Sequence, residues 1–433
     1  RSEPISKYLK ENSHIPYLSR KEIERIQLKK LEDIIKHSYK NIPFYKKLFS
    51  KCGLNIDNLN FPDDIKRLPF LNKSELQENY KVMCTPLMKH KISIDHTSGS
   101  TGKPLVIFKD RDRSAFIRAT MYRFYNMYGI NIGDKQARFW GVPLVKSKEL
   151  KEHLKDVVGN RIRLNAFKVN NENLNHFVKK LKRFKPKYFY GYPSLIYDFA
   201  KWIQQHNLKE KELKKLNLSC IITTGEILYD FQRKMIEETF NCKVANEYGA
   251  SEVGIIAFEC RYGNLHINSD HIFLEVVSNK NYGELVVTEL NNFYNPLIRY
   301  KIKDFGLIKT INCKCGIKFP ILAKLYGREV DFIVSPDNNY IYASVLTYNF
   351  RLKKGIKDFQ AIQNKKDLLL IKIVPDDNFD DDVLMFFRKK LTEALGNKIK
   401  IEFLKVEKIT PDGSGKLRYF ISNISLSKDE LSI

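Results

Sequence analysis

The sequence predicts an α/β protein in which a large N-terminal domain of layered sheets and helices is followed by a small α+β C-terminal domain. From about residue 90, short apolar segments alternate with segments of helical periodicity, as in a partly parallel sheet covered by helices. After Glu252 the pattern changes to one strand after another. Past Arg328 a compact β-α-β pattern occupies about 105 residues, which is enough for a small domain.

Capping residues, prolines and apolar periodicity set the predicted boundaries. Ser19 and Glu22 form a capping box that begins a helix, and this helix ends by Pro43 because the residue before a proline resists helical backbone angles. The strands predicted in the alternating region are Val106–Phe108, Ala137–Val142, Tyr188–Tyr190, Ile221–Thr223 and Val244–Asn246. The helices predicted there are Ser114–Tyr128, Leu174–Arg183, Ser194–Gln205 and Tyr229–Phe240.

An antiparallel or barrel-like subdomain is expected at about residues 255–327, with strands at Leu265–Ile267, Ile272–Val277, Glu284–Thr288 and Leu307–Thr310. The C-terminal pattern predicts strands at Phe359–Gln363, Leu368–Val374 and Ile399–Phe403, and a helix at Asp381–Leu395 closed by Gly396. We therefore place the N-terminal domain at 1–327 and the C-terminal domain at 328–433.

Composition narrows the class of protein. A chain of 433 residues with 43% hydrophobic and 12% aromatic residues is typical of a globular protein with a large core. No apolar run approaches the roughly 18 residues that would span a bilayer, and residues 1–20 lack the apolar core of a secretory signal. Seven cysteines are an odd number and too sparse for a disulfide scaffold. We expect a cytoplasmic protein without an integral membrane segment.

The net charge of +25 permits an anionic partner, but no nucleic-acid-binding motif accompanies it. The densest basic run, residues 179–187, ends a predicted helix, where cations complement the helix dipole and face solvent. Because lysine is abundant along the whole chain, a nucleic-acid partner is not expected. ATP or an acidic glycan precursor would need only a local positive field.

The most informative motif is the run Thr97-Ser98-Gly99-Ser100-Thr101-Gly102-Lys103. Glycines let a backbone approach an anion closely, and successive N–H groups, hydroxyls and a lysine suit nucleotide phosphates. The motif is not the mononucleotide P-loop, which has four residues between its glycines and a Ser or Thr after the lysine; here Pro104 follows Lys103. Alone, the run is equally typical of a surface turn.

Four further clusters follow in order. Residues 221–226 are an apolar strand running into Gly225 and Glu226, and residues 246–254 place Asn246, Tyr248 and Glu252 on one loop. Residues 299–306 contain Asp304 at a strand end, and residues 326–328 lead through Arg328 into the C-terminal region, which carries Lys416 in its last loop. Singly, each cluster could be a turn, and Asp304 could simply pair with Arg299.

Together, in this order and spacing, the motifs resemble the adenylate-forming superfamily of acyl-CoA synthetases, adenylation domains and luciferases, over nearly the whole chain. The finer resemblance is to the phenylacetate–CoA ligase branch and, within it, to the capsular polysaccharide biosynthesis ligase-like proteins. The short C-terminal domain supports it, as do residues 41–45, 68–70, 96–102, 160–165 and 191–194. The resemblance implies the adenylate-forming fold with a mobile C-terminal lid.

The resemblance also implies roles for these residues. The 97–103 loop would hold the β- and γ-phosphates of ATP, with Thr101 close to them, and Glu252 would bind Mg²⁺. Asp304 would accept both ribose hydroxyls, and Arg328 would reach the ribose or phosphate. Lys416 would place its charge between the attacking carboxylate and the α-phosphate. The remaining nucleotide-binding residues would be Asn246 and Tyr248, with Gly225 and Glu226 along the adenine.

One position departs from the pattern of the family. Relatives often carry an acidic residue or a lysine two positions after the junction arginine, where it serves as the hinge for rotation of the C-terminal domain. Here Val330 stands at that position, between Glu329 and Asp331. The departure places the hinge, and the extent of the second-step rotation, in question, and it leaves adenylation as the firmer half of the mechanism.

The cysteines indicate a second site. Cys313 and Cys315 flank one residue before a glycine, and Cys260 with His266 would complete a Cys₃His zinc site. The spacing alone leaves open that these cysteines are small buried hydrophobes. Similar positions occur in the phenylacetate–CoA ligase branch, which favours a structural zinc ion. Cys52, Cys84, Cys220 and Cys242 are expected to be packing residues.

The sequence therefore predicts an AMP-forming ligase that activates a carboxylic acid with ATP and Mg²⁺ and passes the acyl group to CoA. Transfer to an amine or hydroxyl of a sugar or other acceptor in surface polysaccharide biosynthesis is the alternative, and a non-catalytic scaffold with the same fold is another. Trp140, Tyr192 and Pro193 lie on segments that approach the acyl group in relatives, although aromatic residues at strand ends are more often core. The acid itself is not predicted.

Overall fold

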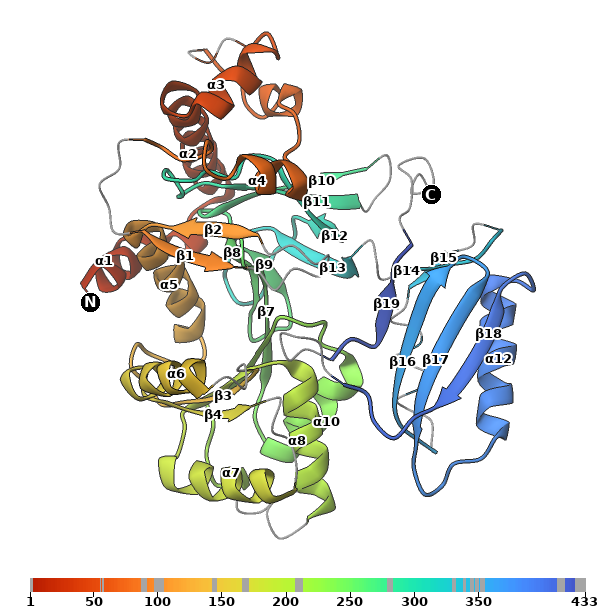
Figure 1. Ribbon diagram of the computed structural model, residues 1–433. Helices are drawn as coiled ribbons and strands as arrows, with labels where there is room; N and C mark the ends of the chain where they lie inside the picture. Colours follow the sequence, from red (N-terminus) through yellow and green to blue (C-terminus); the bar gives the residue numbers. More distant parts are fainter. Residues whose placement is uncertain are drawn as a thin grey trace.

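The structure is a computed structural model that describes residues 3–54, 56, 58–86, 92–96, 105–141, 146–165, 171–206, 213–278, 283–328, 332–337, 340–342, 346, 350, 355–410 and 417–424. Its arrangement is shown in Figure 1. The N-terminal elements are α1 (Glu3–Asn12), α2 (Arg20–Asn41), α3 (Pro43–Ser50) and α4 (Lys73–Asn79), with short 3₁₀ turns at Ile15–Tyr17 and Asp64–Arg67. The capping box predicted for α2 is confirmed, since Ser19 and Glu22 bond reciprocally.

The layered region alternates strands and helices. Its elements are β1 (Ser93–His96), β2 (Val106–Lys109), α5 (Arg111–Asn126), β3 (Gln136–Trp140), α6 (Lys146–Val158), β4 (Arg161–Asn165), α7 (Asn171–Phe184), β5 (Tyr188–Gly191), α8 (Pro193–Gln205), β6 (Cys220–Thr224), α10 (Asp230–Phe240) and β7 (Val244–Ala250). The strands that follow are β8 (Gly254–Glu259), β9 (Leu265–Ile267), β10 (Ile272–Val277), β11 (Gly283–Glu289), β12 (Tyr300–Lys309) and β13 (Ile321–Arg328). The predicted α/β class is confirmed.

One 11-stranded sheet joins both regions, in the order β10-β11-β12-β13-β9-β8-β7-β6-β5-β3-β4. The strands β4, β3, β5, β6 and β7 pair in parallel. From β7 to β10 every pairing is antiparallel. Of the two arrangements expected for the later strands, the antiparallel one is therefore found, as a continuation of the parallel sheet. The short strands β1 and β2 form an antiparallel pair of their own.

Helices cover both faces of the parallel part. On one face, side chains such as Phe139, Phe189 and Ile221 pack against α7, α8 and α10. On the other face, Tyr188 and Ile222 pack against α5. Because side chains alternate along a strand, each central strand contributes to both layers. This two-sided burial explains why the central strands read as nearly continuous apolar runs in the sequence.

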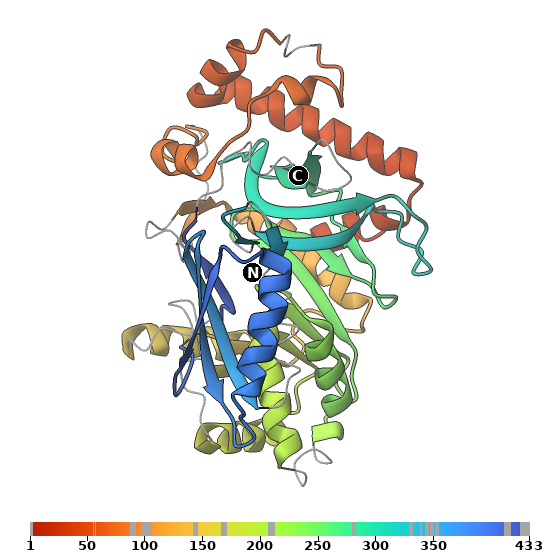
Figure 2. The ribbon, with the colours of Figure 1, turned by 90° about the vertical axis from the view of Figure 1, so that its right-hand side faces the viewer.

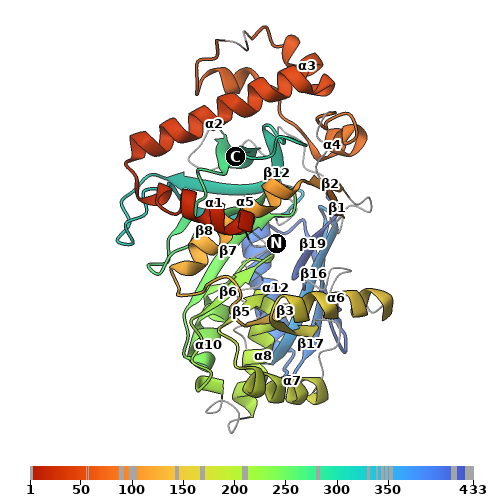
Figure 3. The ribbon, with the colours of Figure 1, turned by 90° about the vertical axis from the view of Figure 1, so that its left-hand side faces the viewer.

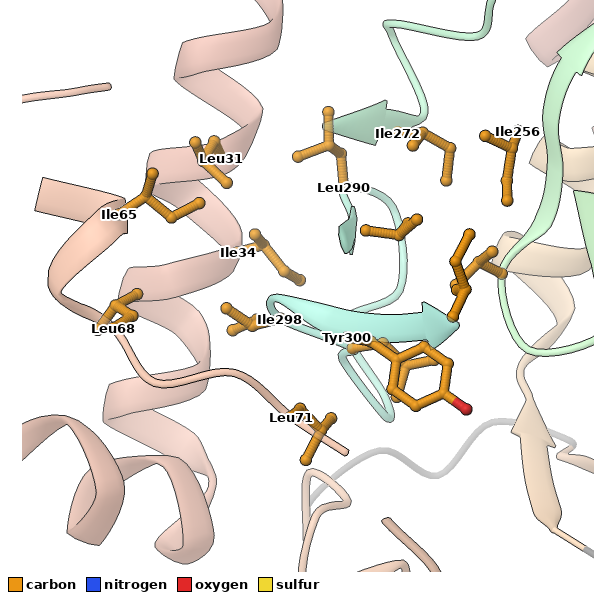
Figure 4. Close-up of a cluster of buried hydrophobic side chains, with 14 of the residues drawn as sticks. Leu31, Ile34, Ile65, Leu68, Leu71, Ile256, Ile272, Leu290, Ile298 and Tyr300 are labelled. Carbon is orange, nitrogen blue, oxygen red and sulfur yellow. The ribbon is translucent and has the colours of Figure 1, made fainter. Parts of the chain in front are cut away.

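The N-terminal helix α2 packs on the antiparallel part of the sheet. Leu31 and Ile34 are fully buried and point toward Leu290 and Ile298, as Figure 4 shows. The smaller helix α1 lies beside α5 (Figure 3), where Ile5 packs against Ala115 and Ala119. The strand-rich part of the sheet is thus covered by α2, from the far N-terminal part of the described chain.

The C-terminal region is a separate layer. It contains the pair β14 (Phe332–Val334) and β15 (Tyr340–Tyr342), followed by β16 (Ile356–Lys365), β17 (Leu368–Pro375), α12 (Asp382–Leu395), β18 (Lys400–Lys405) and β19 (Phe420–Ser422). A four-stranded sheet has the order β18-β17-β16-β19, and α12 lies against it (Figure 2). The predicted closure of this helix is confirmed, since Gly396 has φ +87° and its N–H bonds to the Thr392 carbonyl. Among the described residues, no helix is long and apolar enough to cross a membrane.

Candidate active site

The predicted phosphate loop and the predicted catalytic lysine lie outside the described residues. These are Thr97, Ser98, Gly99, Ser100, Thr101, Gly102, Lys103 and Lys416, and Val330 is outside them as well. Their neighbours are placed, however. The two strands that flank residues 97–103 in the sequence pair with each other, with His96 opposite Val106. Leu417, the residue after Lys416, is described.

The turn after β6 contacts the C-terminal domain. Gly225 has φ +81°, a backbone conformation that glycine adopts without strain. The carboxylate of Glu226 accepts a hydrogen bond from the Ser194 N–H at the start of α8, at 3.1 Å. Its other oxygen accepts from the Leu417 N–H, at 3.2 Å. The structure therefore brings the residue next to Lys416 to the predicted adenine-side turn.

A second group of predicted residues also comes together. The Tyr248 hydroxyl donates a hydrogen bond of 2.6 Å to Asp304, and Asp304 lies opposite Arg328 in the pairing of β12 with β13. The N–H of Asn246, two residues earlier on β7, donates to the Glu259 carboxylate at 2.7 Å. Asn246 and Tyr248 lie on β7, and Glu226 lies in the turn after β6. All three are at the carboxyl edge of the parallel sheet.

Two sequence interpretations need correction at these positions. Residues 246–254 are not one loop, because β7 continues to Ala250 and pairs with β8, with a bulge between Tyr248 and Gly249. Backbone pairing with the next strand outweighs the turn signals of the glycines. Asp304 lies inside β12 and not at its end. Arg299 forms its ion pair with Glu275, at 2.8 and 3.0 Å, and not with Asp304.

Glu252, the predicted magnesium ligand, lies in the turn between β7 and β8, and its side chain is half-buried. Arg113 of α5 holds this turn in place, because its guanidinium donates a hydrogen bond to the Glu252 carbonyl. The same guanidinium forms a fully buried ion pair with Glu289, at 2.5 and 3.0 Å. His271 lies beside the pair, 3.8 Å from Glu289, and its Nε2 donates to the Val253 carbonyl at 2.9 Å.

Sequence reasoning missed a buried carboxyl group at this edge of the sheet. Glu247 of β7 accepts hydrogen bonds from the hydroxyls of Tyr125 at 2.8 Å and Tyr190 at 3.2 Å. Burial raises the pKa of Glu247, while these hydrogen bonds oppose the shift. Its position in a buried strand next to Tyr248 was the available signal, because a buried acid requires partners.

Trp140 and Tyr192, two of the three residues predicted to lie near the acyl group, form an aromatic wall. Trp140 at the end of β3 stacks on Tyr192, with ring centroids 4.2 Å apart. Tyr192 and Pro193 are buried, whereas Trp140 is half-buried. Arg138 lies under this wall: its guanidinium carbon is 4.8 Å from the centroid of the Trp140 ring and 5.3 Å from that of Tyr190.

The predicted metal cluster is assembled. The ligand atoms of Cys260, His266, Cys313 and Cys315 all lie within 4.8 Å of one another. The Cys260 and Cys313 sulfurs are 3.7 Å apart, and the Cys315 sulfur is 3.3 Å from His266 Nε2. The other ring nitrogen, Nδ1, contacts the Phe319 carbonyl at 3.2 Å, which leaves Nε2 for a ligand.

Comparisons with known proteins agree with this arrangement. Residues 333–423 match the CapK C-terminal domain. The chain is 28% identical to Protein CapK of Staphylococcus aureus over 408 residues, which cover 92% of this chain and 89% of that protein. It is 26% identical to Phenylacetate-coenzyme A ligase of Pseudomonas putida over 324 residues, which cover 71% of each chain.

Solved structures show the same architecture. The crystal structure of 2-hydroxyisobutyryl-CoA ligase in the postadenylation state, in complex with R3-HIB-AMP, is similar with a TM-score of 0.76 and 19% identity, over 95% of this chain and 91% of that one. For the same ligase with 2-HIB-AMP and CoA in the thioesterification state, the TM-score is 0.62 at 20% identity, over 94% and 91%.

The protein thus has the fold of the adenylate-forming CoA ligases. It is a homologue of CapK and of the phenylacetate–CoA ligases, which confirms the resemblance drawn from the motifs.

The buried His271 makes stability pH-dependent. Burial lowers the pKa of His271 to about 3, whereas an unfolded histidine titrates near 6.5. The unfolded chain therefore binds a proton first as the pH falls, and the stability contributed by neutral His271 decreases below about pH 6.5. Between pH 7.5 and 5 we expect wild type to lose about 2 kcal/mol more unfolding free energy than His271→Gln.

Urea unfolding at the two pH values measures this difference. The Gln side chain keeps a donor for the Val253 carbonyl but does not titrate. His176→Gln, at an exposed position on α7, is the control and should keep the wild-type pH dependence. Equal losses in wild type and His271→Gln would show that His271 is not the titrating group.

Proposed function

We propose that the protein is an ATP- and Mg²⁺-dependent ligase that activates a carboxylic acid as an acyl-adenylate, releases pyrophosphate and transfers the acyl group to CoA. The observation that carries the proposal is the bond between Glu226 and the Leu417 N–H, because it brings the neighbour of Lys416 to the edge of the sheet that carries Tyr248 and Asp304. Relatives named as phenylacetate–CoA ligases support the same activity.

Activation brings two anions together, so catalysis depends on charge neutralisation and positioning. The 97–103 loop would hold the β- and γ-phosphates. The Asp304 carboxylate, oriented by Tyr248, would accept the ribose hydroxyls. Arg328, opposite Asp304, would reach the ribose or phosphate. Lys416 would neutralise charge between the carboxylate and the α-phosphate.

The Glu252 carboxylate is the hard oxygen donor that Mg²⁺ prefers. Its turn is fixed by the bond from Arg113 to its carbonyl, so a magnesium ion held there would neutralise phosphate charge at a defined place. We further propose that residues 1–327 bind ATP and the acid and that residues 328–433 form the lid, because the main sheet ends at Arg328.

Lys416→Ala should abolish acid-dependent pyrophosphate exchange while leaving ATP binding nearly unchanged. Its ammonium acts mainly where transition-state charge develops, and removal of one such group costs about 10²–10³ in rate. Exchange kinetics and calorimetric ATP titration separate the two effects. Lys408→Ala, an exposed lysine of the same region, is the control. An unchanged exchange rate in Lys416→Ala would remove the assignment of Lys416.

We also propose that the cysteine cluster holds a structural zinc ion. Tetrahedral zinc with sulfur bonds of about 2.3 Å separates two ligand sulfurs by about 3.8 Å, close to the 3.7 Å between Cys260 and Cys313. The hydrogen bond from Asn264 to the Cys313 sulfur, at 3.2 Å, suits a charged thiolate. The ion would join the β8–β9 turn to the segment before β13.

Purified protein should contain close to one zinc ion per chain. Cys313→Ser should lower both the zinc content and the melting temperature, because metal binding contributes to folding free energy. Cys52→Ser, at a cysteine far from the cluster, is the matched control. Elemental analysis that finds no zinc in protein purified without chelator would refute the site.

The acceptor is the second half of the proposal. Given a suitable acid, ATP and CoA, the enzyme should consume one free thiol for each AMP released, as measured by thiol titration and nucleotide chromatography. Release of AMP without loss of thiol, accelerated by an amine or a sugar, would instead identify a nitrogen or oxygen acceptor. That outcome would leave the adenylation step intact.

A further inference from the structure

An arginine beside the aromatic wall has no direct ion-pair partner among the residues that the structure describes. Arg138 of β3 makes no hydrogen bond or ion pair with any residue that the structure describes, and its Nε is buried without a partner. The residue as a whole is half-buried. An arginine remains charged at every physiological pH. A negatively charged group bound beside Arg138 would therefore be stabilised.

The neighbouring arginines show what a satisfied site on this face looks like. Parallel pairing places Arg163 of β4 beside Arg138 and Tyr190 of β5 on its other side. Arg163 bonds to Asp156 of α6 at 2.7 and 2.8 Å, and Arg161 bonds to the same carboxylate. Asp156 is therefore already shared by two arginines.

The other nearby carboxylates are also engaged. Glu152 of α6 pairs with Arg163 and Lys155. Glu247 lies on the same face beyond Tyr190, where the charge of Arg138 lowers its pKa against the effect of burial, but its hydrogen bonds are accepted from Tyr125 and Tyr190 and not from Arg138. The region around Arg138 thus has more cations than carboxylates, and burial together with Arg161 and Arg163 lowers the pKa of Arg138.

The position of Arg138 indicates which part of a ligand would reach it. Neighbouring strands lie about 4.8 Å apart. Because β5 separates β3 from β6, Arg138 lies about 10 Å across the sheet from the strand that leads into Gly225 and Glu226, and about 14 Å from β7. The described nucleotide-binding residues that we propose lie in the turn after β6 and on β7, β12 and β13, whereas Arg138 lies with Trp140 and Tyr192.

We propose that Arg138 recognises a second carboxylate on the acid that the enzyme activates, so that the substrate class is a dicarboxylic acid. The inference rests on the proposed function. The half-buried ring of Trp140, which stacks on the buried Tyr192, would flank the substrate between its two carboxylates. The terminal nitrogens of Arg138 would bind the remote carboxylate in the bidentate geometry that guanidinium favours.

The test compares each dicarboxylate with the acid in which a methyl group replaces the second carboxyl. The probes are succinate to suberate with their methyl partners, and isophthalate with 3-methylbenzoate. We measure acid-dependent pyrophosphate exchange and, independently, the rise in melting temperature that each acid causes in the presence of ATP. The variants are Arg138→Gln, Arg138→Lys and, as control, Arg183→Gln on the exposed face of α7.

For at least one dicarboxylate we expect an exchange kcat/KM at least tenfold above that of its methyl partner. Arg138→Gln should lower kcat/KM for the dicarboxylate about 10- to 100-fold and change the methyl partner less than threefold. Arg138→Lys should keep part of the preference, and Arg183→Gln should keep all of it. Because Arg138 makes no hydrogen bond or ion pair with a described residue, Arg138→Gln should still fold, and its melting temperature without ligand serves as the check on folding.

The outcomes separate the two proposals. Stabilisation by a dicarboxylate that Arg138→Gln loses, without exchange by any acid, would keep the role of Arg138 and refute the ligase activity. Exchange with equal efficiency for both members of every pair would refute the dicarboxylate inference and keep the ligase. Equal losses for both acids in Arg138→Gln, or neither stabilisation nor exchange by any dicarboxylate, would also overturn the inference.

Discussion

The buried ion pair of Arg113 and Glu289 is the constraint on which the site depends. It joins α5 to the end of β11, and its guanidinium also holds the Glu252 carbonyl. Removing one partner of a buried pair typically costs about 3–5 kcal/mol, because the other charge is left uncompensated. The Asn292 side-chain amide donates to Glu289 Oε2, the oxygen that also accepts from Arg113 Nη2. The turn that carries Glu252 is therefore fixed by a pair whose disruption would strongly destabilise the fold.

The curvature of the sheet is the second requirement. β7 and β12 are separated by three strands in the sheet order, which would place them about 19 Å apart if the sheet were flat. Tyr248 nevertheless bonds to Asp304 at 2.6 Å. Twist and the bulges at Tyr248/Gly249 and Phe305/Gly306 bend the antiparallel part over the edge of the parallel part. A continuous sheet thus forms two sides of one site.

Local patterns in the sequence predicted the helices and strands well. They did not predict which side chains pair when the two residues are far apart in the sequence. The capping box of Ser19 and the buried strand of residues 220–224 follow from neighbouring residues, and the structure has both. The cysteine cluster was predicted from its spacing together with the resemblance to the phenylacetate–CoA ligase branch, and its four ligand atoms lie within 4.8 Å of one another. By contrast, Tyr125 and Glu247 lie 122 residues apart, and Arg113 and Glu289 lie 176 apart. Only the folded sheet and the packing of α5 on it bring such residues together.

The arginines of the sheet region differ in whether their charge is paired within the protein or is available to a ligand. Arg113, Arg123 and Arg299 each form an ion pair with an acid that the chain supplies, namely Glu289, Asp270 and Glu275. Each pair joins distant segments, so its energy goes into the fold. Arg138 lies in an equally ordered part of the sheet, yet its neighbours on β4 and α6 have taken the available carboxylates. Desolvating a cation without a partner is unfavourable, and a bound anion at Arg138 would recover that cost. In the proposed role of Arg138, the free energy gained when its charge is paired by a ligand would favour substrates that carry a second negative charge.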